Sequence, residues 1–259
     1  MTPIPQTDSV QCRPEVNNPM RHSIWFTRLP FLLLCFGAAL HTKTIFAYEK
    51  LVLAVPVFPP YTYIDEQQQL TGSGTTKVTQ LLESMGLEYQ FRVVANHGVA
   101  ADLMQKGLVD GFFLATQNQA RDQAGVMSAA VMYNNWTWFY LHNSPLPPTS
   151  PHFRIQAKIG TRLNTNTYQW LLDNDYLIAA KTSEVSTLVV MLINKRLDAV
   201  FLSADAFWHA LTETGIDRSL VHHTTQSSQP FSCYFSKAYL ARNPGFLEQF
   251  NHLAVTTKD

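Results

Sequence analysis

The first residues with a recognisable chemistry lie at positions 107–123, where the sequence reads GLVDGFFLATQNQARDQ. An apolar run, which predicts a buried strand, is followed after a short polar segment by Arg121. A guanidinium so close to a core needs an anion to face, because an unpaired buried charge is costly. Its planar fork of donors fits a carboxylate in a way that lysine cannot reproduce. Arg121 is therefore a candidate anion-binding residue, and the alternative is an exposed arginine beside Asp122 in a solvated loop.

Sequence patterns of catalytic and metal-binding sites are absent from the chain. There is no HExxH motif, no nucleophile elbow and no phosphate-binding glycine loop, since the GSG at 72–74 lacks the lysine of a P-loop. His222 and His223 are adjacent, and on a strand their side chains point to opposite faces, which predicts surface residues rather than metal ligands. We therefore expect no catalytic residues, no metal and no cofactor.

The charge balance of the 259-residue chain is zero, with 19 basic and 19 acidic residues. Nucleic-acid binding requires a basic surface that replaces counterions, so we expect no nucleic-acid partner. The chain is 46% hydrophobic, which suits a soluble globular protein with one large or two modest cores. We expect it to be a monomer.

The first 47 residues predict a secretory signal peptide. Phe31–Leu40 is an apolar block with a basic flank, and it is too short to span a bilayer. Cleavage is predicted after Ala47, and Met20 is an alternative start that gives a more typical signal length. The mature protein, which we expect in the periplasm, then has one cysteine, Cys233, and no internal disulfide.

Strands and helices alternate along the mature sequence. In its first part, strands are predicted at 50–58, 89–94 and 109–116, and helices at 76–85 and 98–106. This order is typical of a parallel sheet with helical crossovers.

The same order recurs in the second part, with strands predicted at 153–161, 176–182 and 196–203 and helices at 166–172 and 184–194. Further strands are predicted at 136–141 and 230–237, and a last helix at 243–253.

A short internal repeat links the two parts. The segments LMQKGLVDGFF and MLINKRLDAVF place Asp110 and Asp198 alike, 88 residues apart. The repeat predicts two similar lobes, one formed by residues 48–140 and 224–259 and the other by residues 141–223. Ligands of such sheets bind at the carboxyl ends of the parallel strands.

The order of these segments resembles that of the family 3 bacterial extracellular solute-binding proteins, periplasmic receptors that feed polar amino acids and related carboxylates to ABC importers. The resemblance rests on PPYTY after the first strand, LTGSGTTKVTQLLESMG, T-x-x-x-x-R-D and MSAAVMY, and it covers essentially the whole mature chain. It implies an α/β fold, the type II periplasmic-binding-protein clamshell, in which each lobe is a mainly parallel sheet flanked by helices. It also implies a permease in the inner membrane as a partner.

In that family an arginine after the third strand pairs with the carboxylate of the ligand, and a threonine assists it. The resemblance assigns these roles to Arg121 and Thr116. It places Phe58 and Tyr61 where aromatic rings pack on the apolar part of the ligand, with ordinary core packing as the alternative.

The resemblance places other residues around the ligand. Thr161 and Arg162 follow a strand of the second lobe and would contact the carboxylate from the other side. The alternative for Arg162 is a solvated residue without a ligand contact. His97 lies where an aromatic side wall is expected, with a structural role as the alternative. The remaining expected contacts are Leu114, Tyr63, Ser203 and Asp205.

The sequence departs from the family where amino-acid receptors hold the ligand's ammonium group. Val55 and Ser203 stand at the positions of the two acids that serve this purpose. A buried ammonium without an anion is unfavourable. Either Asp205, Asp65 or Glu66 replaces these acids, or the ligand has no α-ammonium.

Three functions follow as hypotheses. The first is a solute-binding protein that captures a small carboxylate, an amino acid or a relative, between the lobes. The second is a dehydratase on the same fold, similar to cyclohexadienyl dehydratases, for which the candidate acids are Glu66, Asp205 and His97. The third is a ligand-sensing accessory protein that acts in trans.

Overall fold

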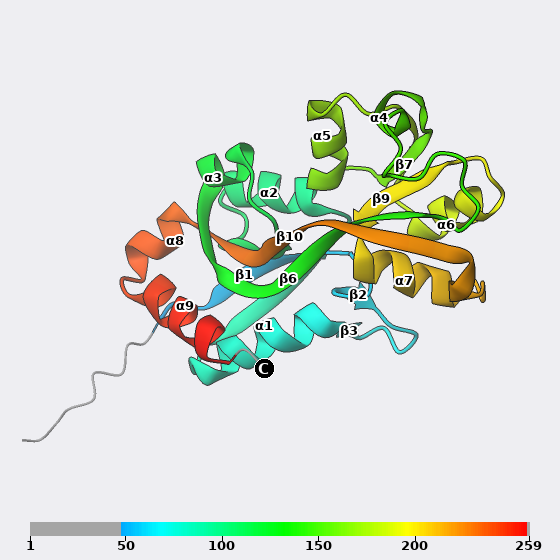
Figure 1. Ribbon diagram of the computed structural model, residues 1–259. Coiled ribbons are helices and arrows are strands. Elements are labelled where there is room, and N and C mark those ends of the chain that lie inside the picture. The colour runs from blue at the N-terminus through cyan, green and yellow to red at the C-terminus, as the bar shows by residue number, and fades with distance from the viewer. Residues whose placement is uncertain (1–47, 258–259) are drawn as a thin grey trace, which may run out of the picture. The chain divides into compact units, whose positions relative to one another are not determined.

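The computed structural model describes residues 48–257, so the predicted signal peptide and its cleavage site lie outside the described residues. Eight strands form one mixed sheet in the order β4-β1-β5-β10-β6-β9-β7-β8 (Figure 1). Two short strands, β2 (Tyr63–Ile64) and β3 (Leu70–Thr71), form a separate antiparallel pair. No helix among the described residues is both long and apolar enough to span a bilayer.

The first strand group consists of β1 (Leu51–Pro56), β4 (Tyr89–Val94) and β5 (Gly111–Ala115), all parallel. Helix α1 (Ser73–Ser84) joins β1 to β4, and α2 (His97–Gln105) joins β4 to β5. The apolar sequences of β1 and β5 are almost fully buried, because helices cover the sheet on both faces.

The second strand group repeats this arrangement with β7 (Ile159–Arg162), β8 (Ile178–Thr182) and β9 (Ala199–Ser203), also parallel. Helix α5 (Asn166–Asp173) follows β7, and α6 (Val185–Ile193) follows β8. The two groups confirm the predicted repetition of strand, helix and strand.

Two long antiparallel strands, β6 (Gly125–Leu141) and β10 (Val221–Ser236), join the groups (Figure 1). One end of β10 pairs with β5, and the far end of β6 pairs with β9. Their register shifts near the middle, between Thr225 and Ser227 and again after Phe231. The two parallel groups are thus parts of one continuous sheet, and the predicted lobe boundaries stay a prediction.

The remaining helices connect or follow these strands. They are α3 (Gln119–Ala124), α4 (Phe153–Gln156), α7 (Ala204–Glu213), the 3-10 turn η1 (Arg218–Leu220), α8 (Lys237–Arg242) and α9 (Phe246–Thr256). The last of them, α9, packs against β6.

The internal repeat has a structural cause. Asp110 accepts a hydrogen bond from the backbone N–H of Val52, at 2.9 Å, and Asp198 accepts one from Lys158, at 2.7 Å. Each aspartate therefore ties the residue before its own strand to the beginning of a neighbouring parallel strand. The sequence repeat thus corresponds to a repeated hydrogen bond between an aspartate and the backbone of a neighbouring strand.

Some predicted elements are wrong in type or length. Residues 153–156 form a helical turn rather than a strand. The ring of Phe153 in this turn contacts that of Trp138, with centroids 5.0 Å apart. β6 begins at Gly125 and β10 at Val221, both well before the predicted starts. α7 was not predicted, and the single terminal helix is two helices, α8 and α9.

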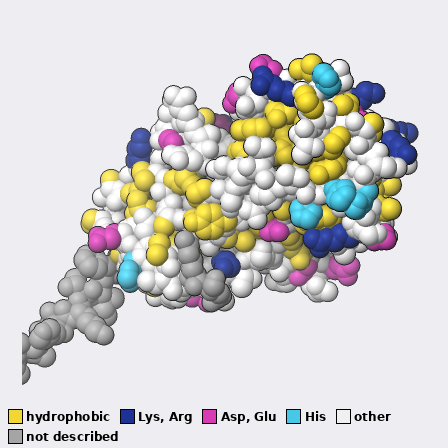
Figure 2. Space-filling model, viewed as in Figure 1, with side chains coloured by type: hydrophobic (Ala, Val, Ile, Leu, Met, Phe, Trp, Pro, Cys, Tyr) yellow, Lys and Arg dark blue, Asp and Glu magenta, His cyan; other side chains and the backbone are white. Residues whose placement is uncertain are grey.

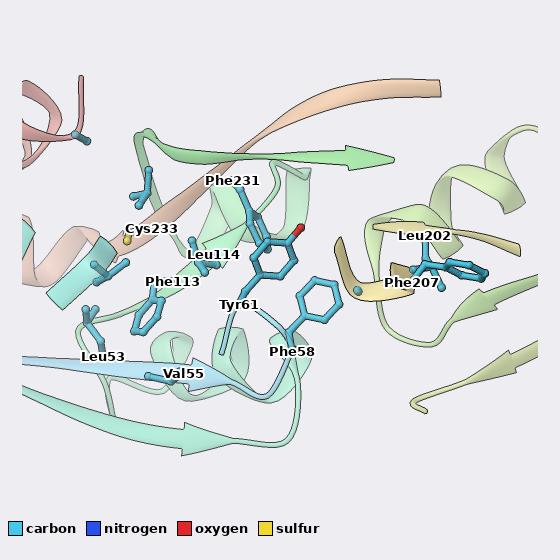
Figure 3. Packing of buried hydrophobic residues seen from close by; sticks show 14 of the residues in the cluster. Leu53, Val55, Phe58, Tyr61, Phe113, Leu114, Leu202, Phe207, Phe231 and Cys233 are labelled. Atoms are coloured by element: carbon cyan, nitrogen blue, oxygen red, sulfur yellow. The ribbon is translucent and has the colours of Figure 1, made fainter. Parts of the chain in front are cut away.

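One hydrophobic cluster extends from the first strand group into the second. Figure 3 shows Leu53 and Phe113 at one side of it and Phe207 at the other. The rings of Phe58 and Tyr61 lie between them, with centroids 5.4 Å apart. The core therefore reaches the place where the two groups meet.

Gly111 gives a test of how tightly this sheet is built. A Cβ at Gly111 would lie 2.2 Å from the backbone oxygen of Tyr234 in β10, so Gly111→Ala must push the two strands apart. We expect Gly111→Ala to lower the free energy of unfolding by about 2–3 kcal/mol, measured by urea denaturation. Gly98→Ala is the control, because its nearest neighbour is a side-chain oxygen of Asn96 at 3.1 Å. Equal midpoints for the two variants would contradict this packing.

Candidate functional site

A small cavity lies at the carboxyl ends of the parallel strands, between the two strand groups. Its free volume is about 30 Å³, room for about two water molecules. The lining residues are Phe58, His97, Ala115, Thr116, Arg121, Asn134, Trp136, Arg162, Thr165, Asn166, Thr167, Leu202, Ser203 and Phe231.

A larger and more open hollow, of about 570 Å³, adjoins this cavity. The two share His97, Arg121, Thr165 and Asn166. The hollow therefore reaches the cavity from the side of α2, α3 and α5. A ligand larger than water requires the two groups to move apart.

Arg121 lies in helix α3, whose N-cap residue Asn118 accepts a hydrogen bond from the backbone N–H of Arg121 at 2.9 Å. Its side chain donates to the backbone oxygen of Thr116, and the residue is only 8% exposed. Burial lowers the pKa of Arg121 to about 10. The residue is thus helical and buried, not part of a solvated loop.

Arg121 has no ion-pair partner among residues 48–257. The neighbouring carboxylate of Asp122 instead accepts hydrogen bonds from Tyr234, at 2.7 Å, and Gln117, at 2.9 Å. The guanidinium is therefore a buried cation at the cavity wall. No carboxylate of the described residues lies within ion-pair distance of it, and the charge of Asp122 acts on it only from farther away.

Arg162 is a second buried cation, at the end of β7, and it is 7% exposed. It donates to the backbone oxygens of Ser183, at 3.2 Å, and of Val57 in the first strand group, at 3.0 Å. Its guanidinium carbon lies 4.4 Å from the centre of the Phe58 ring. Burial lowers the pKa of Arg162 to about 10. No carboxylate of the described residues forms an ion pair with Arg162, and the charge of Glu184 acts on it only from farther away.

His97 begins helix α2, where the side chain of Asn96 caps the backbone N–H of Val99. Its Nε2 lies 2.5 Å from the backbone oxygen of Leu114. A carbonyl only accepts, so Nε2 carries the proton and Nδ1 is an acceptor. Burial, together with the positive charge of Arg121, lowers the pKa of His97 to about 3. The imidazole is therefore neutral at neutral pH.

Tyr61 links the two strand groups through its phenol. The phenol donates to Asp205 at 3.0 Å and lies 2.8 Å from the hydroxyl of Ser203. A phenol has one proton, so Ser203 is the donor of the second bond. Burial raises the pKa of Tyr61, which keeps the phenol protonated. Asp205 is thus engaged by the protein itself.

Asn166 forms a second link across the cavity. Its amide nitrogen donates to the hydroxyl of Thr116, at 2.6 Å, and to the backbone oxygen of Gln117, at 2.9 Å. Its amide oxygen accepts from Asn118 at 2.8 Å. Helix α5 is therefore held against the segment that carries Arg121.

Six of the eleven residues predicted at the site line the cavity: Phe58, His97, Thr116, Arg121, Arg162 and Ser203. Five do not: Leu114, Tyr61, Tyr63, Thr161 and Asp205.

Three of these five residues have other contacts in the structure. Thr161 donates to the backbone oxygen of Phe201 within the sheet, at 2.8 Å. The ring of Tyr63 lies near His209, with centroids 6.0 Å apart. Leu114 has a positive φ of 59°, and its backbone oxygen accepts a hydrogen bond from His97.

Residues of the crossing strands at the cavity were missed by the sequence analysis. Asn134 and Trp136 come from β6, and Phe231 comes from β10. The Oδ1 atom of Asn134 is buried and has no hydrogen-bond partner. The sequence analysis predicted strands at 136–141 and 230–237 but assigned no ligand contact to them.

Acidic residues are absent from the cavity lining. Asp65 accepts a bond from Gln69 in its own loop, and Glu66 is exposed. Glu184 and Glu213 line a separate hollow of about 130 Å³ that shares Phe58 and Arg162 with the cavity. None of the acids proposed to replace the family's ammonium-binding residues therefore lies at the cavity wall.

On the face of the molecule that Figure 2 shows, no large patch of one charge stands out. In Figure 2 basic and acidic side chains are dispersed over the visible face. Within the described residues, no three His, Cys, Asp or Glu side chains form a metal-binding group. His222 and His223 are exposed and point apart, as predicted, since His222 contacts His142 and His223 contacts Trp208.

Comparison with solved structures identifies the fold. A histidine kinase sensor domain with similarity to periplasmic binding proteins has a TM-score of 0.69, at 15% identity over 81% of this chain and 92% of that chain. The fold is the two-lobed fold of periplasmic binding proteins. No protein-family model and no curated protein matches the chain.

Two further structures with this fold hold amino acids. An ancestral arginine-binding protein bound to arginine has a TM-score of 0.65, at 17% identity over 81% of this chain and 92% of that chain. A substrate-binding protein of an ABC uptake transporter from Streptococcus pneumoniae, with bound histidine, has a TM-score of 0.65 at 14% identity, over 80% of this chain and 86% of that chain. At these identities the likeness establishes the fold alone.

His97 predicts a pH dependence of stability. Its folded pKa of about 3 lies below the ordinary value of 6.5, so only the unfolded chain takes up this proton between those pH values. The stability that neutral His97 contributes is complete above pH 6.5 and is lost as the pH falls. From pH 6.5 to 5 the loss should be about 2 kcal/mol.

The measurement is urea denaturation of the wild type and of His97→Gln, whose amide nitrogen can still donate to Leu114. The variant should lose less stability than the wild type over this pH range. His252→Gln, on the exposed face of α9, is the control and should follow the wild type. If the free energy of unfolding falls with pH equally in all three proteins, protonation of His97 does not destabilise the folded state and the prediction is wrong.

Proposed function

We propose that this protein is a periplasmic solute-binding protein that captures a small carboxylate between its two lobes and delivers it to an ABC importer. One observation carries the proposal: the buried guanidinium of Arg121 lines the cavity and has no ion-pair partner among the described residues. A ligand carboxylate offsets the desolvation of that charge and accepts its forked donors.

The fold supports a receptor. The solved structures with this fold include proteins bound to arginine and to histidine, and one of them serves an ABC uptake transporter. The predicted signal peptide agrees with a place outside the inner membrane. A permease of that membrane would then be the partner that accepts the closed, loaded form.

Binding without catalysis agrees better with the cavity than a dehydratase does. A dehydratase needs an acid that protonates the leaving group. Glu66 is exposed and Asp205 accepts a bond from Tyr61, and neither lines the cavity. His97 is neutral and its one N–H is bonded to Leu114.

A sensing role is the second candidate, because a histidine kinase sensor domain shares the fold. In that case the loaded protein acts on a membrane kinase in trans instead of on a permease. Capture of the chain by membranes that contain a candidate permease or a candidate kinase, with and without ligand, distinguishes the two roles.

Arg121→Ala tests the proposed binding site. Calorimetry against a panel of amino acids and small carboxylates should find a ligand for the wild type. Arg121→Ala should weaken its binding by about 30-fold or more, because one partner of a buried charge pair is removed. Arg121→Lys keeps the charge without the fork and should also bind more weakly.

Arg154→Ala is the matched control, since Arg154 is exposed and pairs with Asp175 at the surface. It should bind the ligand as the wild type does. Unchanged affinity in Arg121→Ala, with its melting curve intact, would remove the proposed site.

A further inference from the structure

We infer that the cavity is built for a small dicarboxylate that carries a hydroxyl group and no ammonium group. This inference rests on the proposed function and specifies its ligand class. It follows from three features of the cavity: its two unpaired guanidinium groups, the lack of an acid at its wall, and the unsatisfied oxygen of Asn134.

The first feature is an excess of positive charge. Arg121 and Arg162 are both buried at the cavity wall, and both lie close enough to His97 to lower its pKa. Like charges in a poorly solvated space repel each other. A ligand with two negative charges offsets both cations, whereas a zwitterion brings no net charge. The cavity therefore favours a dianion.

The second feature is the lack of a partner for a cation. The carboxylate of Asp205 accepts the phenol proton of Tyr61, and that of Asp122 is bonded to Tyr234. Glu184, whose charge acts on Arg162, lines a separate hollow, and none of these three acids lines the cavity. An ammonium group would therefore sit near two guanidinium groups without a carboxylate, which is unfavourable.

Phe58 strengthens this argument. An aromatic face is a good site for a ligand cation. Here the guanidinium of Arg162 already lies over the Phe58 ring, 4.4 Å from its centre. The protein thus occupies this position with its own cation, and a ligand such as arginine cannot use it.

The third feature is Asn134. Asn134 lines the cavity, and its Oδ1 atom is buried without a hydrogen-bond partner; such an atom needs a donor. A ligand hydroxyl donates to it without adding positive charge. Asn134 would then distinguish a hydroxylated ligand from one that lacks the hydroxyl.

Four ligands that differ by single groups test the inference. Malate, aspartate and succinate share one carbon skeleton and differ in a hydroxyl, an ammonium or a hydrogen, and lactate keeps the hydroxyl but has one carboxylate. Calorimetry on the wild-type protein, freed of bound ligand, should find malate tightest. Succinate should bind about 10-fold more weakly, because Asn134 is left without a donor. Aspartate and lactate should bind at least about 30-fold more weakly.

Variants of Asn134 and Arg162 test which residue causes each difference in affinity. Asn134→Ala should bring malate to the affinity of succinate, whereas Asn135→Ala, the exposed neighbour on β6, should leave the difference unchanged. Arg162→Gln should weaken the binding of malate more than the binding of lactate, since only malate has a second carboxylate for this cation. The comparison among wild-type ligands stands even where a variant folds poorly.

The outcomes separate this inference from the proposed function. If aspartate, arginine or histidine binds as tightly as malate and Arg121→Ala abolishes that binding, the proposed receptor function is supported and the inferred ligand class is wrong. Equal affinities for malate and succinate would likewise overturn the assignment of the hydroxyl. If neither these four ligands nor the wider panel binds, the proposed function fails together with the inference.

Discussion

The arrangement of the cavity depends on one physical constraint, the burial of a guanidinium group without a protein carboxylate to pair with it. The backbone of Arg121 is held by the cap at Asn118, and its guanidinium donates to the backbone oxygen of Thr116. These neutral partners orient the charge but do not neutralise it. In the proposed receptor, the anionic ligand would supply that neutralisation.

The continuous sheet explains how distant residues reach this charge. β6 and β10 run through both strand groups, so their middle segments lie beside the carboxyl ends of β5 and β9. Asn134 and Phe231 are therefore delivered to the cavity by strands, whereas Arg121 and Arg162 come from the ends of the parallel groups. Asp110 and Asp198 tie down each group in the same way, at the amino ends of the parallel strands and thus away from the cavity.

The sequence predicted the parts of this structure that are local. Apolar runs located β1, β4, β5 and β9 closely, and a cation just after a buried strand pointed to Arg121. Contacts between distant residues were not predictable, because no local pattern encodes them. Tyr61 was expected to contact the ligand, yet its phenol is bonded to Ser203, 142 residues away. Asn166 was missed for the same reason, since its partner Thr116 is 50 residues distant.

The contacts across the cavity also indicate how a ligand's charge acts on closure. Tyr61 with Ser203, and Asn166 with Thr116, hold the two strand groups together by direct hydrogen bonds. In the proposed receptor the same approach brings Arg121 and Arg162 to one small cavity, where their repulsion would oppose closure. A ligand shifts such an equilibrium only by the difference in its affinity for the two states. An anion that touches both cations in the closed state, and one at most in the open state, supplies that difference directly.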